Sequence, residues 1–330
     1  MKKLLSLLLM ATVSTLFMSC SDDNPSPEPT TPQFAEVKLN CGGEFSVTEQ
    51  PWTRATGGKT FYAFRIDSMH VEERYEPHMQ VYYDTTYVSY AEGLFDASQD
   101  FSVKLQLGHK YKIHSLIVHE EADHLVNNGT AYNLPFTTSS DQWINCTNSF
   151  TYTKSSNMNL DNCDGIASSG NKWIFIPSLE KYYGFKDIDC SYDLPNEITI
   201  PMLRYSFMIE MNITPPSVGK LNVHIPDGVS IEPYVVKSTD SKFTDTKIFV
   251  IPHVTYSNRD EVKRLSIDVK WDKPNGSPYA NLYKINICRN HKYKVNIDFT
   301  NYNTNTKINF SQEDIEYKDG ETIKIDCYNE

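Results

Sequence analysis

The feature that most constrains the fold is a strict two-residue alternation of apolar and polar side chains between residues 203 and 213. Six apolar side chains share one parity: Leu203, Tyr205, Phe207, Ile209, Met211 and Ile213. Arg204, Ser206, Glu210 and Asn212 occupy the other parity, where Met208 is the exception. Because successive side chains of a strand point to opposite faces, this pattern predicts a half-buried β-strand.

Shorter alternating runs recur along the chain. Residues 101–107 and 111–118 predict a hairpin that turns at Gly108 and His109. Beyond Pro215 and Pro216, apolar runs follow one another at the spacing of an antiparallel sandwich, over residues 220–225, 229–236, 247–252, 264–271, 282–288 and 292–300. Aromatic residues make up 12% of the chain, which favours strands. The sequence therefore predicts an all-β fold.

Between residues 127 and 193 the periodicity fades, and Asn, Ser, Thr and Asp dominate. We interpret this stretch as long irregular loops, with short helices and edge strands, that decorate a first domain. Regular alternation resumes near residues 193–199, so we predict an N-terminal domain over residues 34–195 and a C-terminal domain over residues 196–330.

The N-terminal residues have the pattern that is typical of an export signal. Lys2 and Lys3 precede the apolar run 4–17, which is followed by Met18, Ser19 and Cys20. This resembles a lipoprotein signal peptide of residues 1–19, cut so that the Cys20 thiol can carry lipid; an ordinary signal with an incidental cysteine is the alternative. Residues 20–33 then form a tether whose proline-rich part, 25–32, is extended. The run 4–17 is too short to span a bilayer as a mature helix.

Charge and cysteine content limit the partners and the chemistry. A net charge of −11 without a basic cluster argues against nucleic acid as a partner. With Cys20 assigned to lipid, six cysteines remain, which permits disulfides in an exported protein. One bridge among Cys146, Cys163 and Cys190 and buried free thiols are both open at this point.

The residues that catalysis or metal binding would use do not fall into the patterns of known sites. Four histidines recur every five residues, a period that cannot bring them to one face of a strand: His109, His114, His119 and His124. His119 and His124 are one residue too far apart for the HExxH motif. Around Gly165, the spacing lacks the first and twelfth ligands of a calcium loop. GxSxG, P-loop and GxGxxG motifs are absent. We expect no catalytic site, no metal and no cofactor, and hence a protein that is not an enzyme.

Several local stretches, taken in order, resemble the fimbrillins, subunits of the type V pili of anaerobic gut and oral bacteria. They are the lipoprotein signal, Arg54 followed by Ala55 and Thr56, the YAFRI strand of residues 62–66, the YYGF segment of residues 182–185 leading into the strand of 198–213, Trp271 at a strand end, and the Arg-Asn-x-x-Tyr-x-Val pattern within residues 285–297. The resemblance covers residues 16–300 and skips 127–180.

The resemblance implies two transthyretin-like antiparallel β-sandwich domains in tandem and assembly by donor-strand exchange. A protease would cut between Arg54 and Ala55 and release the strand of residues 34–47. An extended segment of the next subunit would then fill the groove that this strand leaves. The side chains that fill the groove before cleavage would be Val37, Leu39, Phe45 and Val47. With Phe34, these five would contribute on the order of 10 kcal/mol. Arg54 as an ordinary solvated loop residue is the alternative.

This reading predicts a fimbrial structural, anchor or adhesive subunit on the outer membrane. Cleavage would release the lipid and tether with the first strand, giving a stalk or tip subunit; an uncut chain would stay anchored through lipid, such as palmitate, on Cys20. The expected partners are other fimbrial subunits, the outer membrane, and host or bacterial surface glycans or proteins. The other hypothesis is a glycan-binding lipoprotein of a nutrient-uptake system, with Tyr82 and Trp143 stacking on sugars. Residues 305–330 would be a donor strand or a closing strand.

Overall fold

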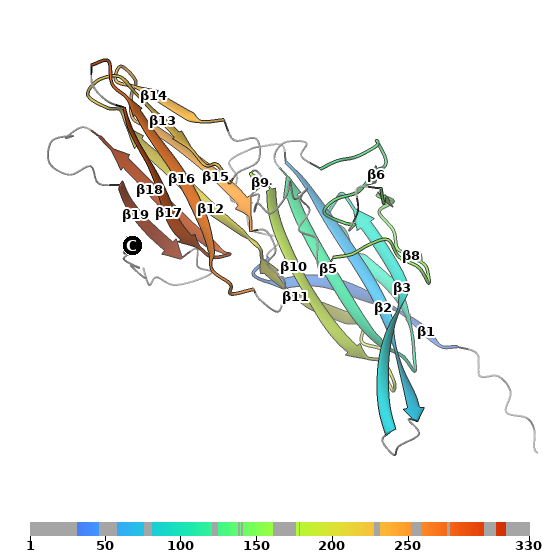
Figure 1. Ribbon diagram of the computed structural model, residues 1–330. Coiled ribbons are helices and arrows are strands. Elements are labelled where there is room, and N and C mark those ends of the chain that lie inside the picture. The colour runs from blue at the N-terminus through green and yellow to red at the C-terminus, as the bar shows by residue number, and fades with distance from the viewer. Residues whose placement is uncertain are drawn as a thin grey trace, which may run out of the picture. The chain divides into compact units, whose positions relative to one another are not determined.

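The computed structural model describes residues 32–45, 58–75, 81–120, 125–137, 139, 141–160, 176–177, 179–227, 232–251, 259–275, 278–299 and 308–314. In these ranges the regular elements are all β-strands, which confirms the all-β expectation (Figure 1). None of the same residues belongs to a helix that is long and apolar enough to cross a membrane. The strands all lie in one compact unit, residues 34–330.

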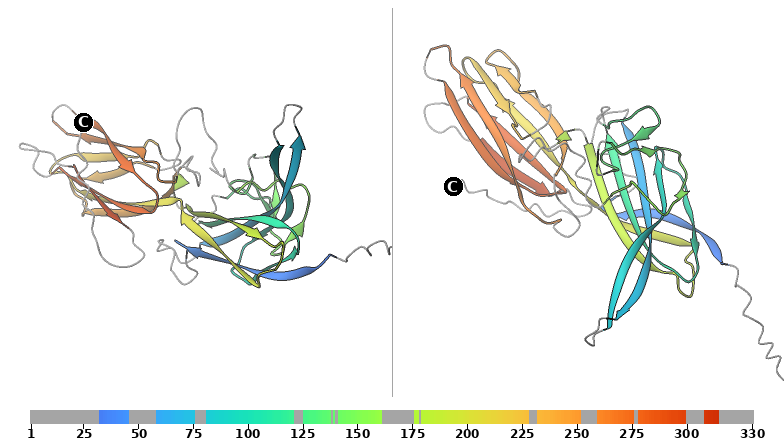
Figure 2. Two further views of the ribbon diagram at one scale, coloured as in Figure 1. Left: turned by 90° about the horizontal axis from the view of Figure 1, so that it is seen from below. Right: turned by 45° about the vertical axis from the view of Figure 1, so that its right-hand side comes forward.

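The first sheet has eight strands in the order β4-β1-β11-β10-β5-β2-β3-β8. Its strands span Phe34–Gly43 (β1), Lys59–Tyr75 (β2), Val81–Phe95 (β3), Phe101–Gln106 (β4), Lys110–Glu120 (β5), Thr151–Tyr152 (β8), Leu179–Asp189 (β10) and Glu197–Arg204 (β11). The sheet curls on itself, because side chains from β1, β4 and β11 pack in one core against side chains from β2, β3 and β5. Figure 2 shows β1, in blue, crossing β2 and β3 rather than running beside them.

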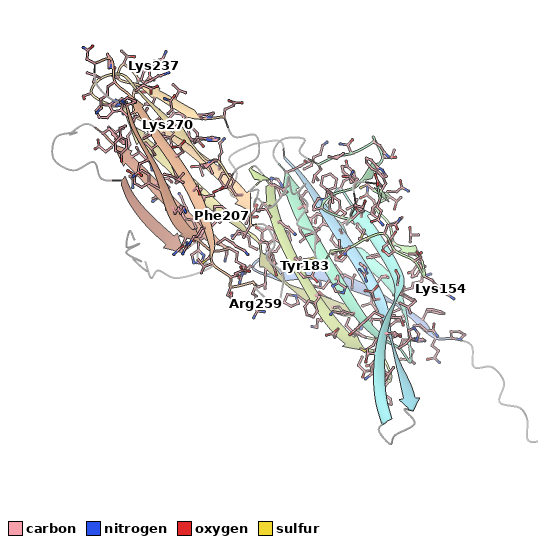
Figure 3. The ribbon with its side chains drawn as sticks, viewed as in Figure 1. Lys154, Tyr183, Phe207, Lys237, Arg259 and Lys270 are labelled. Carbon is pink, nitrogen blue, oxygen red and sulfur yellow. The ribbon has the colours of Figure 1, made fainter. Side chains whose placement is uncertain are left out.

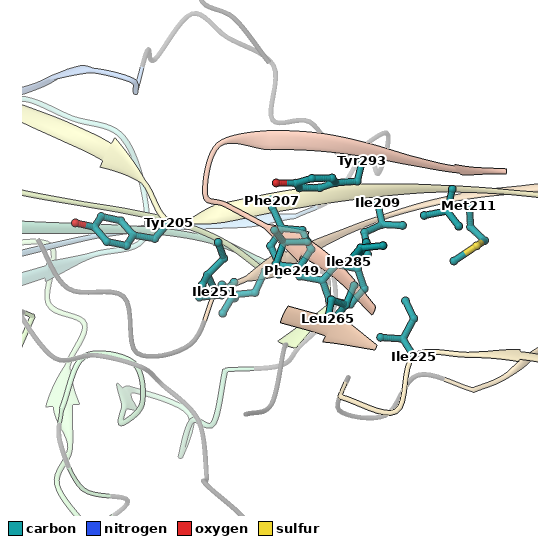
Figure 4. Close-up of a cluster of buried hydrophobic side chains, with 14 of the residues drawn as sticks. Tyr205, Phe207, Ile209, Met211, Ile225, Phe249, Ile251, Leu265, Ile285 and Tyr293 are labelled. Atoms are coloured by element: carbon teal, nitrogen blue, oxygen red, sulfur yellow. The ribbon is translucent and has the colours of Figure 1, made fainter. Parts of the chain in front are cut away.

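The second part is a sandwich of two sheets, ordered β19-β18-β12-β15-β9 and β14-β13-β16-β17. Their strands span Ile176–Pro177 (β9), Ser206–Thr214 (β12), Lys220–His224 (β13), Tyr234–Lys237 (β14), Phe243–Val250 (β15), Lys263–Asp272 (β16), Tyr279–Ile287 (β17), His291–Asp298 (β18) and Ile308–Asp314 (β19). Phe207 and Ile209 of β12 meet Leu265 of β16 and Ile285 of β17 in the core between the sheets (Figure 4).

The chain passes from the first sheet to the second at Tyr205. The alternating run 203–213 was expected to be one strand, but β11 ends at Arg204 and β12 begins at Ser206. The Tyr205 N–H donates to the Lys181 carbonyl at 2.7 Å, and its carbonyl accepts from the Ile251 N–H at 3.0 Å. The buried parity changes at this break. Strand β11 buries Met202 and Arg204 and leaves Leu203 partly exposed, whereas β12 buries the odd-numbered residues Phe207, Ile209, Met211 and Ile213. Tyr183 and Phe207, labelled in Figure 3, lie on the two sides of this crossing.

The polar stretch after residue 125 covers the outer face of the first sheet. Leu125, Phe136, Ile144 and Met158 are buried in one cluster with Phe61, Leu116 and Val118. The described residues here form β6 (Ala131–Tyr132), β7 (Ile144–Asn145), β8 and turns, and the expected short helices are not among them. Asn side chains explain this, since Asn127 and Asn128 accept hydrogen bonds from the backbone N–H groups of Gly129 and Ala131, which favours turns.

Of the three cysteines that could have formed a disulfide, Cys146 and Cys190 carry free thiols. Cys146 and Cys190 are both unpaired in the structure, and Cys163 lies outside the described residues. Burial raises the pKa of each of these two thiols to about 11, so both are protonated at neutral pH. The structure therefore shows no bridge between Cys146 and Cys190.

Strand β4 forms one edge of the first sheet, and tyrosine hydroxyls form hydrogen bonds with its backbone along that edge. The Tyr90 hydroxyl donates to the Lys104 carbonyl at 2.7 Å, and the Lys104 N–H donates to the Tyr152 hydroxyl at 2.8 Å. The Tyr111 hydroxyl accepts from the Gln106 N–H at 3.0 Å. These tyrosines come from β3, β8 and β5, so they join the two ends of the curled sheet. A closed edge is a poor template for an added strand.

We expect Tyr90→Phe and Tyr152→Phe each to lower the free energy of unfolding by about 0.5–1 kcal/mol, because each removes a hydrogen bond to the β4 backbone. Denaturant unfolding measures this effect. Tyr192→Phe is the matched control, since that side chain is 96% exposed. Equal stability of all three variants would show that the tyrosines do not hold the edge.

Candidate functional site: strand β1 and the residues that hold it

Strand β1 lies between two strands that do not otherwise pair with each other. Its first part runs antiparallel to β4, from Phe34 opposite Gln106 to Leu39 opposite Phe101. Its second part runs parallel to β11, from Lys38 opposite Glu197 to Gly43 opposite Met202. Withdrawing β1 would therefore leave an unpaired edge on both β4 and β11, and open a slot within the sheet.

Two side chains of β1 reach the core. Val37 is 0% exposed and Leu39 is 1% exposed, and both belong to the core of the first sheet. Full burial of two such side chains contributes about 3–6 kcal/mol. Phe34, which was expected to add to this burial, is 54% exposed instead. It stands at the first position of the strand, next to the start of the described chain at residue 32.

Phe45 packs at the rim of the same core. Its ring meets Tyr62 and Tyr182 edge-on, with centroids 6.2 Å and 5.1 Å apart. Of the four side chains expected to fill the groove, Val37, Leu39 and Phe45 thus line this core, whereas Val47 lies outside the described residues. Their role in strand exchange stays a prediction.

The C-terminal end of β1 approaches β11 very closely. A Cβ at Gly42 would lie 3.0 Å from the Thr199 methyl group, and one at Gly43 would lie 2.8 Å from the Met202 carbonyl oxygen. Gly43 also has a φ of +76°, which favours glycine. Just before them, the Cys41 Sγ lies 3.6 Å from the Ser115 Oγ, and burial raises the pKa of Cys41 to about 11.

Glu44 holds the end of β1 to two arginines. Its carboxylate accepts from Arg289 Nη1 at 2.7 Å and 3.0 Å, and from the backbone N–H of Arg204 at 2.7 Å. The Glu44 N–H donates to the Met202 carbonyl at 2.9 Å. Arg289 precedes β18, and its side chain is only 13% exposed. Glu44 therefore ties the first strand of the body to the turn that leads into β18.

A buried polar network lies directly beneath this contact. The Arg204 guanidinium is 3.1 Å from Glu180 Oε1, donates to the Tyr182 hydroxyl at 2.6 Å, and donates to Asn290 Oδ1 at 3.1 Å. The Tyr182 hydroxyl donates to Glu180 at 2.6 Å. Burial, and then the Glu180 charge, raise the pKa of Tyr182 well above its ordinary value. The ion pair is fully enclosed, so its partners depend on one another.

An open cavity of about 220 Å³ adjoins the Glu44–Arg289 contact, and Asp260 and His291 also line it. Asp260 Oδ1 is 3.7 Å from Arg289 Nη2, but its side chain is 81% exposed. Sequence reasoning counted Arg204 only as the polar face of a strand and gave no role to Glu44. Two stretches that the resemblance marked contribute to this network: the YYGF segment, which begins with Tyr182, and the Arg-Asn pair, Arg289 and Asn290.

Cys20, Arg54 and Ala55 lie outside the described residues, so lipidation and cleavage stay predictions. Arg54 belongs to the segment 46–57, which connects β1 to β2. Tyr82 lies in β3, where its side chain is not described, and Trp143 is 37% exposed.

The histidines of the β5 region have structural neighbours instead of converging on one point. His114 Nδ1 is 2.8 Å from the Tyr183 hydroxyl, and His119 Nδ1 is 2.8 Å from Thr60 Oγ1. In the described part of the chain, no three His, Cys, Asp or Glu side chains come together as metal ligands would.

Solved structures of fimbrial proteins are similar to this chain. One is the tip fimbrial protein Mfa3 from Porphyromonas gingivalis with a C-terminal truncation, at 11% identity and a TM-score of 0.32, covering 85% of this chain and 100% of that one. Another is the fimbrial anchor protein Mfa2 from Porphyromonas gingivalis, at 10% identity and a TM-score of 0.30, covering 82% and 92%. No family model and no curated protein matches the chain. These likenesses are distant.

We expect Glu44→Gln to lower the free energy of unfolding by about 1–2 kcal/mol, because Arg289 loses its charged acceptor. Denaturant unfolding measures the change, and Glu36→Gln is the matched control on an exposed position of the same strand. Equal stability of the two variants would mean that Glu44 does not fasten β1.

Proposed function

We propose that this chain is a subunit of a bacterial surface fimbria and that it assembles by exchanging β1 for a strand of another subunit. The observation that carries the proposal is the place of β1: it is the first strand of the compact unit and yet an interior strand of its sheet. A terminal strand at a sheet edge could be lost at little cost. An interior one leaves a slot that must be refilled.

The connectivity makes β1 separable by one cut. On its C-terminal side, only the segment 46–57 links β1 to the rest of the body, and this segment contains Arg54. Cleavage between Arg54 and Ala55 would leave β1 held by its ladders, by Val37 and Leu39, and by Glu44. Those contacts are noncovalent, so the strand can leave once the chain is cut.

The slot would then favour a new strand. Its walls carry unpaired N–H and C=O groups of β4 and β11, and its floor is the apolar core that Val37 and Leu39 had covered. An extended segment can supply both backbone partners and apolar side chains, which is strand addition in its most favourable form. Because tyrosines close the far edge of β4, the new strand pairs on the β1 side.

The N-terminal segment fits two states of the same subunit. Uncut, the chain keeps β1 and stays on the outer membrane through lipid on Cys20, as an anchor would. Cut, it loses the lipid and the tether together with β1, and becomes a stalk or tip subunit. The partners are other fimbrial subunits in both states, and the cleavage decides which state forms.

We expect the mature polymer on intact cells to begin at Ala55, as read by mass spectrometry of the purified material. Arg54→Gln should abolish cleavage, leave a lipidated Cys20 terminus, and remove the high-molecular-weight ladder. Arg264→Gln, on an exposed position of β16, is the matched control and should polymerise normally. Polymers whose subunits still carry residues 34–44 would contradict strand exchange.

A further inference from the structure

The outer face of one sheet of the second sandwich carries an excess of positive charge. In the sheet β14-β13-β16-β17, buried residues alternate with residues that face away from the sandwich. Five of the outward side chains are cationic and two are acidic: Lys220, Lys237, Arg264, Lys270 and Lys284, against Asp268 and Asp272. The whole chain has a net charge of −11, so this face has the opposite sign.

The five cations come from separate segments, so the sequence shows no basic cluster although the fold makes one. Lys237 lies directly opposite Lys220 in the pairing of β14 with β13, and Lys284 lies opposite Ser266 in the pairing of β17 with β16. Lys237 and Lys270 are labelled in Figure 3. Like charges directly opposite each other on one face destabilise a sheet. The pairing of β13 with β14 therefore gains nothing from its two lysines.

Both carboxylates on this face already have partners within it. Asp268 Oδ2 lies 2.9 Å from Lys270 Nζ, and Asp272 Oδ2 lies 3.5 Å from Lys220 Nζ. Asp272 also accepts a hydrogen bond from Asn222 Nδ2 at 3.0 Å. These two acids therefore leave the other three cations of the face unneutralised.

The other three cations are Lys237, Arg264 and Lys284, and all three residues are exposed. In the described part of the chain, no carboxylate forms an ion pair with their side chains. Asp227 and Asp240 lie beside the face, but each carboxylate accepts from a strand N–H instead, at 2.8 Å and 2.7 Å. The three cations are therefore available to an anion from outside the chain.

The uncharged side chains of the same face indicate the kind of partner. Amide, hydroxyl and imidazole groups stand between the cations: Asn222, His224, Ser266 and Asn286. Protein interfaces and membrane surfaces are typically bound through clustered aromatic or large apolar side chains. Here the outward residues of the four strands include no aromatic ring, and Val235 and Leu282 stand singly on opposite edge strands. Cations interspersed with hydrogen-bonding groups suit a ligand that is both acidic and rich in hydroxyl groups.

The spread of the cations indicates an extended ligand. Lys237 lies on β14, Arg264 on β16 and Lys284 on β17, and β14 and β17 are the two edges of the sheet. With neighbouring strands about 4.8 Å apart, the two edges are about 14 Å apart. A single sugar ring is too short to reach across this width, whereas a polymer can.

We propose that the outer face of the sheet β14-β13-β16-β17 binds an acidic polysaccharide. The carboxylate or sulfate groups of the polymer pair with Lys237, Arg264 and Lys284, and its hydroxyl groups form hydrogen bonds with Asn222 and Asn286. This binding adds an adhesive role to the proposed function and does not depend on strand exchange.

The test uses residues 21–330 and immobilised polysaccharides, with binding followed by biolayer interferometry at low ionic strength. Polygalacturonate supplies carboxylates, dextran sulfate supplies sulfates, and unmodified dextran is neutral. We expect at least one acidic polymer to bind, dextran not to bind, and added salt to weaken the binding. The triple variant Lys237→Gln, Arg264→Gln and Lys284→Gln should bind about tenfold more weakly.

The matched control is the triple variant Lys104→Gln, Lys154→Gln and Lys186→Gln, which removes the same charge from exposed positions on or next to the first sheet. It should bind like the unchanged chain. An equal loss in both triple variants would overturn the inference, because net charge alone would then set the affinity.

Three further results would also overturn the inference. They are unchanged binding by the first triple variant, failure of both acidic polysaccharides to bind, and equally tight binding of duplex DNA or polyglutamate. None of these results bears on strand exchange, which the polymerisation of the Arg54→Gln variant tests separately.

Discussion

The structure depends on the pairing of β1 with β4 and β11. With β1, these two strands form one end of the curled sheet, and each has a backbone partner in β1. The core beneath is completed by Val37 and Leu39, which bring apolar surface to the same place where β1 supplies hydrogen bonds. Backbone pairing and apolar burial thus coincide in one short strand, and both are lost together if it leaves.

The end of β1 is joined to the rest of the body by charge. Glu44 reaches Arg289 before β18 and the backbone of Arg204 at the end of β11, and Arg204 is itself fixed by Glu180, Tyr182 and Asn290. Enclosed ion pairs add little net stability but penalise arrangements that break them. This network therefore fixes the end of β1 in its register, while Val37 and Leu39 supply the apolar burial of the strand.

The sequence carried enough information for the strands but not for their partners. The alternation of residues 203–213 and of 101–107 depends only on neighbouring residues, and strands cover both runs, although the first is divided at Tyr205 and the second ends at Gln106. The sheet change at Tyr205 depends on its backbone bonds to Lys181 and Ile251, and the parallel pairing of β1 with β11 joins residues more than 150 positions apart, such as Leu39 and Ile198. The pattern of neighbouring residues cannot predict such contacts between distant parts of the chain. Phe34 shows the same limit, since its apolar character predicted burial at a position that is 54% exposed.

Amide hydrogen exchange before and after removal of β1 tests the central claim most directly. The account predicts that residues 101–106 of β4 and 197–204 of β11 lose protection, that β12 and β18 keep theirs, and that protection returns when a strand peptide is added. Unchanged exchange in β4 and β11 would contradict the account, because it would show that these strands do not depend on β1. Loss of protection throughout the body would contradict it as well, since β1 would then be a part of the core that cannot be exchanged.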